Sequence, residues 1–277
     1  MNDVYELYAI RYATRGNRYA SENFIINAWT QGGSSAESPI DYYFWVIKNA
    51  SRAIVVDTGF TRAEAVVRRQ ASGGVWDPTF FCDPVDAVRM LGVDPAAVSD
   101  VVLTHLHFDH AGSLSAFPSA RFHVQEQEVA YATGPNMNHQ FLNSAYSPDH
   151  IKEFIDLLYG GRVVFHQGDS ALAPGVSLHP LPGHTLGLQG VRVSTKRGSV
   201  LIASDATHFY ANFENTAPFP IVANVTAMLA SFSRFMELAD SPDHIIPGHD
   251  PLVRKKYTPF SPELGDVVFR LDEPIAQ

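Results

Sequence analysis

Residues 101–110 read VVLTHLHFDH, an apolar run followed at once by side chains that can bind metal. β-Branched and apolar residues that stop at an abrupt polar change are typical of a buried strand, so the potential ligands lie on the loop that leaves it. Side chains two positions apart in extended chain point to the same side, and His105 and His107 can therefore reach one ion together. Asp109 and His110 follow at the turn, where they can face a second ion.

Two histidines separated by one residue occur by chance on many surfaces. Four potential ligands within the six positions 105–110, at the end of a strand, are much stronger evidence. Neutral imidazole and carboxylate suit Zn²⁺, and they also suit Mn²⁺, Fe²⁺ and Co²⁺. The count of 12 histidines in the chain is unusual and indicates metal as well.

Three further candidate ligands follow predicted strands later in the chain. His184 comes after the strand at 177–181, and Asp205 comes after the buried strand at 199–203. His184 and His249 each stand in the sequence Pro-Gly-His. Four such loops at one rim could converge, and they would supply five histidines and two aspartates, enough for two divalent ions with an open position for water.

Asp57 also stands at a predicted strand end, in the sequence Asp-Thr-Gly. A carboxylate there could orient a ligand histidine by a hydrogen bond. It could equally form an Asx turn or cap a helix, and the local sequence leaves both interpretations open.

The 277 residues are 45% hydrophobic, which is ordinary for a globular protein and ample for a core. The net charge of −9 argues against a nucleic-acid partner. Cys82 is the only cysteine, so no internal disulfide is expected. The first residues lack the pattern of a signal peptide, and no apolar stretch approaches the roughly 18 residues of a membrane span. We expect a soluble, cytoplasmic protein without a membrane partner.

Strands are predicted at residues 4–11, with a hairpin at 42–47 and 53–56. An amphipathic helix is predicted at 225–239. Two strand-rich halves, each followed by helices, predict an α+β fold, an αββα sandwich of two mixed sheets flanked by helices. We expect one domain across residues 1–277. The polar stretch 133–148 breaks regular structure, as a lid or binding loop does.

The motif His-x-His-x-Asp-His at 105–110, followed by Pro-Gly-His, Ser-Asp and Pro-Gly-His, resembles the metallo-β-lactamase superfamily. The Asp-Thr-Gly turn also matches the superfamily's early Asp-x-Gly. Within the superfamily, residues 104–112 look most like the N-acyl-homoserine lactonases, the quorum-quenching lactonases. The interval from His110 to His184 is longer than usual in that group, which predicts an enlarged loop around 133–150.

The resemblance implies a role for each candidate ligand. The first of two metal ions, usually zinc, would be held by His105, His107 and His184. The second would be held by Asp109, His110 and His249. Asp205 would bridge the two ions, and Asp57 would support the site from behind.

One position departs from the lactonase pattern. These lactonases usually carry a tyrosine three residues after the bridging aspartate, where it can donate to the substrate carbonyl. Here that position is His208, with Tyr210 two residues further on. Histidine can also donate a hydrogen bond, so either side chain could take the role. A purely structural histidine remains the alternative for His208.

The resemblance implies a dinuclear hydrolase that opens a lactone ring. A hydroxide shared by two metal ions would attack the carbonyl, with His208 or Tyr210 stabilising the oxyanion. Asp109 would pass the proton to the leaving alkoxide. The expected partner is a small-molecule lactone or ester, with N-acyl-homoserine lactones first, and a homodimer is left open.

Two alternatives to a lactonase stay open at this stage. One is a hydrolase of another ester, a thioester or an organophosphate on the same scaffold. The other is a metal-binding or sensing protein without turnover. Seven ligands on two ions are more than a purely structural site uses, which favours an enzyme.

Overall fold

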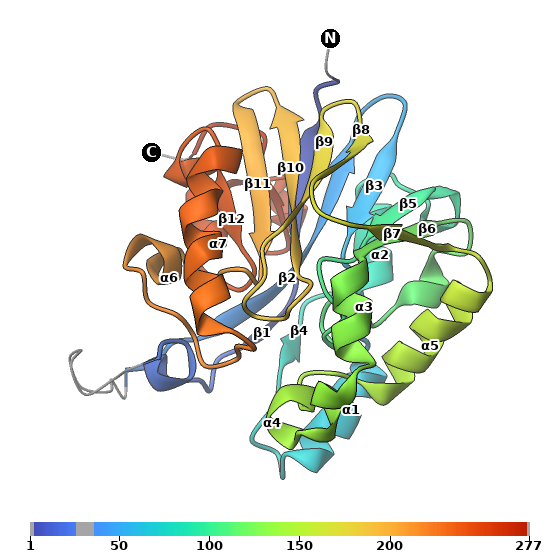
Figure 1. Cartoon of the computed structure of the whole chain (residues 1–277). Helices are drawn as coiled ribbons and strands as arrows, with labels where there is room; N and C mark the ends of the chain where they lie inside the picture. The colour runs from blue at the N-terminus through green and yellow to red at the C-terminus, as the bar shows by residue number, and fades with distance from the viewer. Residues whose placement is uncertain (1–2, 26–35, 276–277) are drawn as a thin grey trace.

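The computed structural model describes residues 3–25 and 36–275, which form two β-sheets packed face to face (Figure 1). The first sheet has the order β13-β14-β1-β2-β3-β5-β6-β7, with β4 paired to β1, and the second has the order β12-β11-β10-β9-β8. Strands of the first sheet are β1 (Glu6–Arg15), β2 (Ile40–Lys48), β3 (Ala53–Val56), β4 (Thr79–Phe80), β5 (Asp100–Val102), β6 (Arg121–Gln125), β7 (Val163–His166), β13 (Thr258–Pro259) and β14 (Val268–Arg270). Strands of the second are β8 (Ser170–Ala173), β9 (Val176–Pro180), β10 (Gln189–Thr195), β11 (Gly198–Ser204) and β12 (Ile245–Pro247).

Both sheets are mixed. The pairs β3–β5, β5–β6 and β6–β7 are parallel, whereas β1–β2 and β2–β3 are antiparallel. In the second sheet β11 and β12 are parallel, and the other pairs are antiparallel. The predicted fold class, an αββα sandwich of two mixed sheets, is therefore confirmed.

Helices cover the outer face of each sheet (Figure 1). Those nearest the first sheet are α1 (Arg62–Ala71), α2 (Pro84–Met90), α3 (Glu126–Ala132) and α5 (Pro148–Tyr159). The short helix α4 (Gln140–Asn143) follows α3, and α6 (Tyr210–Glu214) and α7 (Val225–Leu238) accompany the second sheet. The last helix, α8 (Val253–Lys256), follows β12. None of the helices in the described part of the chain is long and apolar enough to cross a bilayer.

The strands bury side chains on both faces. In β1, Tyr8, Ile10 and Tyr12 pack into the cluster under the helices, while Leu7 and Ala9 pack into the cluster between the sheets. A strand with two buried faces shows an almost continuous apolar sequence, and this is the reason why the runs at β2, β3 and β5 were recognisable. A third cluster packs α7 against the second sheet. The site therefore stands on a rigid four-layer core.

Candidate metal centre

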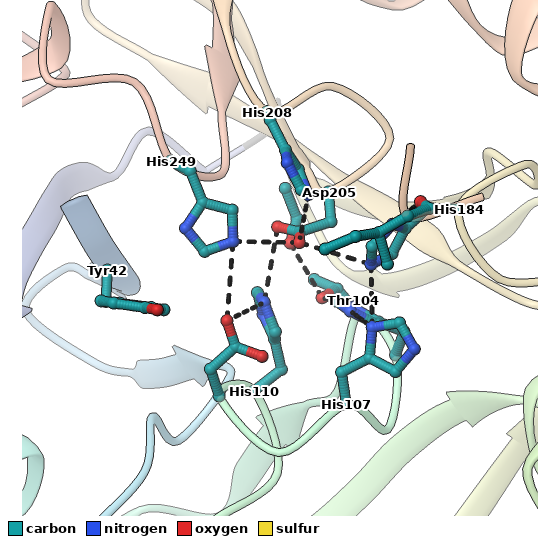
Figure 2. Close-up of polar contacts among 12 residues, drawn as sticks. Tyr42, Thr104, His107, His110, His184, Asp205, His208 and His249 are labelled. Carbon is teal, nitrogen blue, oxygen red and sulfur yellow. Dashed lines mark hydrogen bonds and ion pairs between the residues drawn. The ribbon is translucent and has the colours of Figure 1, made fainter. Parts of the chain in front are cut away.

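The carboxyl ends of β3, β5, β9, β11 and β12 meet at one rim of the sandwich, and the loop after each carries a predicted site residue. In Figure 2 the labelled side chains His107, His184, Asp205, His208 and His249 point toward a common centre from four loops, with Asp205 and His208 on the same one. The order of the strands explains this convergence, because parallel strands in one sheet end at the same edge and the two sheets are stacked.

His105, His107 and His184 form the first group of donors, whose ligand atoms all lie within 4.8 Å of one another. His107 Nδ1 lies 3.1 Å from His105 Nε2 and 2.8 Å from His184 Nε2. The side chains come from two loops that are far apart in sequence, and both loops are buried at this point. The structure thus brings this predicted trio together.

Asp109, His110 and His249 form a second group that also lies within 4.8 Å. Asp109 Oδ2 is 3.6 Å from both His110 Nε2 and His249 Nε2. Asp205 lies between the two groups. Its Oδ2 is 3.0 Å from His249 Nε2 and 3.4 Å from His184 Nε2, and its Oδ1 is 3.4 Å from His110 Nε2. One carboxylate therefore faces donors of both groups.

In four of the histidines, Nδ1 forms a hydrogen bond on the side of the ring away from the centre, and Nε2 faces the centre. His110 Nδ1 donates to Asp57 Oδ2 at 2.8 Å, and His249 Nδ1 donates to the Asp41 carbonyl at 2.8 Å. His184 Nδ1 donates to the Ile221 carbonyl at 2.7 Å. The Thr104 hydroxyl, which donates to Asp57, accepts from His105 Nδ1 at 3.1 Å. Each Nε2 then carries a lone pair, as a metal ligand requires.

These lone pairs are the reason why the residues fit metal ions. The Nε2 lone pairs of His105 and His184 both face His107 Nδ1, at 3.1 and 2.8 Å. A neutral His107 has at most one N–H to offer there, whereas a cation among the three rings would bind a lone pair of each. His110 Nε2 and Asp205 Oδ1 are buried and have no hydrogen-bond partner in the described residues. Buried polar atoms normally have a partner, and a divalent cation would supply it here.

The protonation of the rings agrees with this assignment. Burial lowers the pKa of His105, His107 and His184 below the usual 6.5, so these rings are neutral, the form that binds metal. Burial also opposes the charged form of His110 and His249, but Asp205 and Asp109 together with the other groups that hydrogen-bond these rings outweigh it and raise both pKa values. A cation between these groups would balance the same carboxylate charge that otherwise favours protonation.

Asp57 stands directly behind the first loop and is fully buried. Its Oδ1 accepts from the Thr104 amide at 2.7 Å, and its Oδ2 accepts from the Thr104 hydroxyl at 2.8 Å and from His110 Nδ1. Burial raises its pKa, and His110 opposes that shift. Among the described residues, the Asp57 side chain bonds Thr104 and the ring of His110, the contact expected of a carboxylate that orients a histidine, and it forms neither an Asx turn nor a helix cap.

Replacing Asp57 with alanine should weaken metal binding by about 10- to 100-fold, because His110 would lose the partner that fixes its tautomer. Competition with a chromogenic chelator measures this change. The exposed Asp266 provides the matched control, Asp266→Ala, which should bind metal as the unchanged chain does. Equal affinities in the two variants would show that Asp57 does not orient the site.

Close packing explains the glycines of both Pro-Gly-His sequences. A Cβ on Gly248 would lie 2.1 Å from Asp205 Oδ1, so a side chain there would displace the carboxylate that joins the two groups. Gly183 has φ +148°, and a Cβ there would lie 2.4 Å from the Met228 backbone in α7. The glycines therefore let His249 and His184 approach the centre.

A cavity of about 540 Å³ opens above the donors. Its floor includes His107, Asp109, His184, Asp205 and His249, and its walls include Trp76, Phe108, Tyr131, Phe141, Leu142 and Ile221. Part of the lining comes from the stretch that the sequence indicated as a lid or binding loop, through Phe141, Leu142, Ser144 and Ala145. That stretch is not irregular throughout, since it contains α4 and a 3₁₀ turn at Pro135–Asn138.

The family model described as the metallo-beta-lactamase superfamily matches residues 40–249, about three quarters of the chain. The chain belongs to this superfamily. The match runs from the start of β2 to the last of the predicted ligands, so it includes every donor described above. Membership of this superfamily, together with the His/Asp clusters, implies divalent metal ions.

The relatives of this metallo-beta-lactamase superfamily chain include lactonases. An N-acyl homoserine lactonase from Bacillus sp is 28% identical, and the match covers 86% of this chain and 92% of the relative. An N-acyl homoserine lactonase from Rhizobium johnstonii is 29% identical, and the match covers 79% of this chain and 85% of the relative. A hydrolase of this superfamily with lactonase relatives is therefore shown, as the motif predicted.

Solved structures show the same fold. A quorum-quenching N-acyl homoserine lactone lactonase superposes with a TM-score of 0.70 at 24% identity, over 91% of this chain and 95% of that one. The dizinc quorum-quenching lactonase AidC superposes with a TM-score of 0.63 at 16% identity, over 100% and 97%. At these identities the likeness establishes the metallo-beta-lactamase fold alone.

The two candidate oxyanion donors lie in different places. His208 lines the cavity, its Nε2 is 3.0 Å from Asp205 Oδ2, and its ring stacks on Phe219 with centroids 3.7 Å apart. Tyr210 is 2% exposed and packs between the sheets with Tyr257 and Ile246. It is not part of the described cavity wall. The structure therefore leaves His208 as the candidate and removes Tyr210.

Glu128 is a site residue that the motif reasoning missed. It is the third residue of α3, in the first turn of the helix, and is fully buried. Its carboxylate accepts from the Leu106 amide at 3.0 Å, the Tyr146 hydroxyl at 3.2 Å and the Thr185 hydroxyl at 2.5 Å. Leu106 and Thr185 flank donors of the first group, so one carboxylate ties their two loops together. Burial raises its pKa, and these hydrogen bonds oppose the shift.

Proposed function

We propose that this chain is a dinuclear metal-dependent hydrolase that opens a lactone ring, with N-acyl homoserine lactones as the first candidates. The observation that carries the proposal is the pair of donor groups joined by Asp205 on the floor of a cavity. The names of the relatives support the substrate class, since both are N-acyl homoserine lactonases.

One ion would be held by His105, His107 and His184, and the other by Asp109, His110 and His249, and Asp205 would serve both. Zinc is the first candidate, and manganese, iron and cobalt suit the same imidazole and carboxylate donors. Two bound ions would supply an activated water and polarise the carbonyl oxygen. No side-chain nucleophile is required, and burial raises the pKa of the Cys82 thiol to about 12.

In this proposal Asp109 would move the proton. It lines the cavity, and its Oδ2 lies at equal distances of 3.6 Å from His110 Nε2 and His249 Nε2. The Tyr12 hydroxyl donates to the Asp109 backbone carbonyl at 3.0 Å and fixes the residue from below. A carboxylate held in this way can accept a proton from the attacking oxygen and deliver it to the leaving alkoxide.

In this proposal His208 would hold the carbonyl oxygen. Its Nε2 faces the floor of the cavity beside Asp205, and Phe219 restrains its ring by stacking. In this structure His208 Nε2 lies 3.0 Å from Asp205 Oδ2; with Asp205 engaged by metal ions, the N–H of His208 would be free to stabilise the negative charge that develops on the carbonyl oxygen. Tyrosine and histidine both donate, so the departure from the lactonase pattern retains a donor.

Replacing His208 with alanine should lower kcat by about 100-fold and leave the metal content unchanged, because the variant loses an oxyanion donor and no ligand. Replacing it with tyrosine should keep kcat within about tenfold, since a donor remains. Steady-state kinetics and elemental analysis measure both quantities. His208 also forms a possible metal-binding group with His184 and Asp205. Loss of an ion from His208→Ala would therefore show that His208 is a metal ligand and would contradict its assignment as an oxyanion donor.

Acid release from homoserine lactones tests the function itself. Metal-replete protein should release one proton per lactone in a pH-stat and yield the ring-opened acid by mass spectrometry, and a chelator should stop the reaction. Matched esters, thioesters and phosphotriesters run in parallel should be slower. Intact lactone after incubation with metal-replete protein would overturn the proposal. If only one of the other three classes were hydrolysed, that class would be the substrate instead of the lactone.

A further inference from the structure

Two arginines border the same cavity as the metal donors. Arg15 and Arg18 both line it, and they are only 8% and 6% exposed. Neighbouring wall residues are aromatic, among them Tyr42 and Trp76. An almost buried guanidinium in an aromatic wall is an expensive feature for a pocket that receives only neutral ligands.

The sheet register places these arginines close to the metal floor. Arg15 ends β1 and pairs with Ile40, the first residue of β2. The next residue, Asp41, exchanges two hydrogen bonds with His249: its amide donates to the His249 carbonyl at 3.0 Å, and its carbonyl accepts from His249 Nδ1. Only β2 therefore lies between the end of β1 and the candidate ligand His249. The arginines and the ligands line the same cavity.

Arg18 is held in place by a buried amide. Its Nε donates to Asn23 Oδ1 at 2.6 Å, and its NH2 group donates to the Glu22 carbonyl at 2.8 Å. Asn23 is fully buried and is anchored by its own bonds to Ser38 and by the Asn212 amide. These bonds orient the guanidinium without supplying a negative charge.

The arginine pair is short of negative charge. Glu22 lies 3.4 Å from Arg15, and across residues 3–25 and 36–275 it is the one carboxylate that forms an ion pair with either arginine. Burial lowers the pKa of Arg18, which reflects the penalty of holding this charge out of water. Asp109 also lines the cavity, but its carboxylate faces His110 and His249 in the second donor group.

Arg68 gives the contrast, because it also lines the cavity but is fully engaged. It pairs with Glu64 at 2.7 Å, donates to the Ser144 and Tyr146 carbonyls, and covers the Phe108 ring at 3.6 Å. Its role is to join α1 to the loop after α4. Arg15 also has partners, since it pairs with Glu22 and donates to the Asn17 side chain at 3.2 Å and to the Asn17 carbonyl at 3.5 Å. Arg18 differs from both, because its hydrogen-bond partners in the described residues are the neutral Asn23 amide oxygen and the Glu22 carbonyl.

We propose that the substrate carries a carboxylate on the arm remote from the lactone ring, and that Arg18, supported by Arg15, binds it. The inference rests on the proposed function, because it places the ring on the metal floor and the arm along the aromatic wall. A planar guanidinium matches a carboxylate with two parallel N–H donors, which gives both affinity and orientation.

Binding of unreactive lactams separates this inference from catalysis. Two γ-lactams resist hydrolysis and share one N-acyl arm, which ends in a carboxylate in the first and in a primary amide in the second. Calorimetry with metal-replete protein should show that the carboxylate binds about 10- to 100-fold more tightly, the range of a charge-assisted hydrogen bond. Arg18→Met should remove that preference and leave the amide's affinity within about threefold.

Two further variants keep the result interpretable. Arg18→Lys keeps the charge without the fork and should retain part of the preference, so it replaces Arg18→Met if that variant does not fold. Arg89→Met changes an exposed arginine on α2 and should behave as the unchanged chain does. Equal binding of the two lactams by the unchanged chain, or an equal loss of both in Arg18→Met, would overturn the inference.

Turnover of the corresponding lactones distinguishes the two proposals. If the carboxylate lactam binds in an Arg18-dependent way while neither lactone is opened, the arginine site stands and the lactonase proposal fails. If both lactones are opened at equal kcat/KM, the lactonase proposal stands and the arginine site fails.

Discussion

Replacing Asp205 with alanine should lower lactone hydrolysis by more than about 100-fold and reduce the bound metal below two ions per chain. Within residues 3–25 and 36–275, Asp205 is the one carboxylate that approaches histidines of both donor groups, at 3.0 Å from His249 and 3.4 Å from His184 and His110. Supporting residues alone change metal affinity by 10- to 100-fold, so a shared ligand should exceed that range.

Elemental analysis and steady-state kinetics on the same preparation measure both effects. Asp156→Ala is the matched control, because Asp156 lies exposed on α5 and far from the site in sequence. Circular dichroism should show that both variants fold. Two ions per chain with activity within tenfold of the unchanged chain would contradict the bridging role of Asp205.

Replacing Glu128 with alanine should lower the free energy of unfolding by about 3 kcal/mol, and activity should fall with it. The change leaves the Leu106 amide and the Thr185 hydroxyl buried without their acceptor, and each unpaired group costs about 1–3 kcal/mol. The loops that carry His107 and His184 would also lose their shared anchor, so their donors would separate.

Urea unfolding of metal-free protein measures the stability change without a contribution from the ions. Glu128→Gln keeps one acceptor oxygen and should lose about half as much. Tyr146→Phe removes a single hydrogen bond to the same carboxylate and should lose about 1 kcal/mol. A Glu128→Ala protein as stable as the Tyr146→Phe protein would show that the carboxylate does not tie the loops.

The sequence was sufficient for the donors because each one follows a strand. A buried strand is visible in a single sequence as an apolar run, and its end fixes where the next side chains stand. His105, His184 and Asp205 all have this context, and the sheet order then brings them together. The sequence does not explain why a glycine precedes His249. The structure does, because a Cβ at Gly248 would collide with Asp205.

The choice between His208 and Tyr210 depended on a turn. Thr207 Oγ1 donates to the Phe209 carbonyl at 2.7 Å, and the Tyr210 amide donates to Asp250 Oδ2 at 2.9 Å. These bonds form at the start of α6, where the Tyr210 side chain packs in the core, whereas His208 lines the cavity. Side chains two residues apart in a turn can point in the same or in different directions. The spacing alone therefore could not show which of His208 and Tyr210 faces the cavity.

Residues far from any motif were beyond prediction for a different reason. Glu128 in α3 has no local pattern that marks it. The first strand was expected at residues 4–11, but β1 continues to Arg15 because β2 and β4 pair with its second half. That extension carries Arg15 to the rim and places Arg18 beside the cavity, and it depends on partners distant in sequence.

Hydrolysis as a function of bound metal tests the central claim most directly. Metal-free protein would be titrated with zinc while lactone hydrolysis and bound zinc are followed in the same samples. We predict negligible activity without metal and a maximum rate when two ions are bound per chain. Full activity with one ion, or a rate that does not depend on metal, would contradict a dinuclear hydrolytic centre.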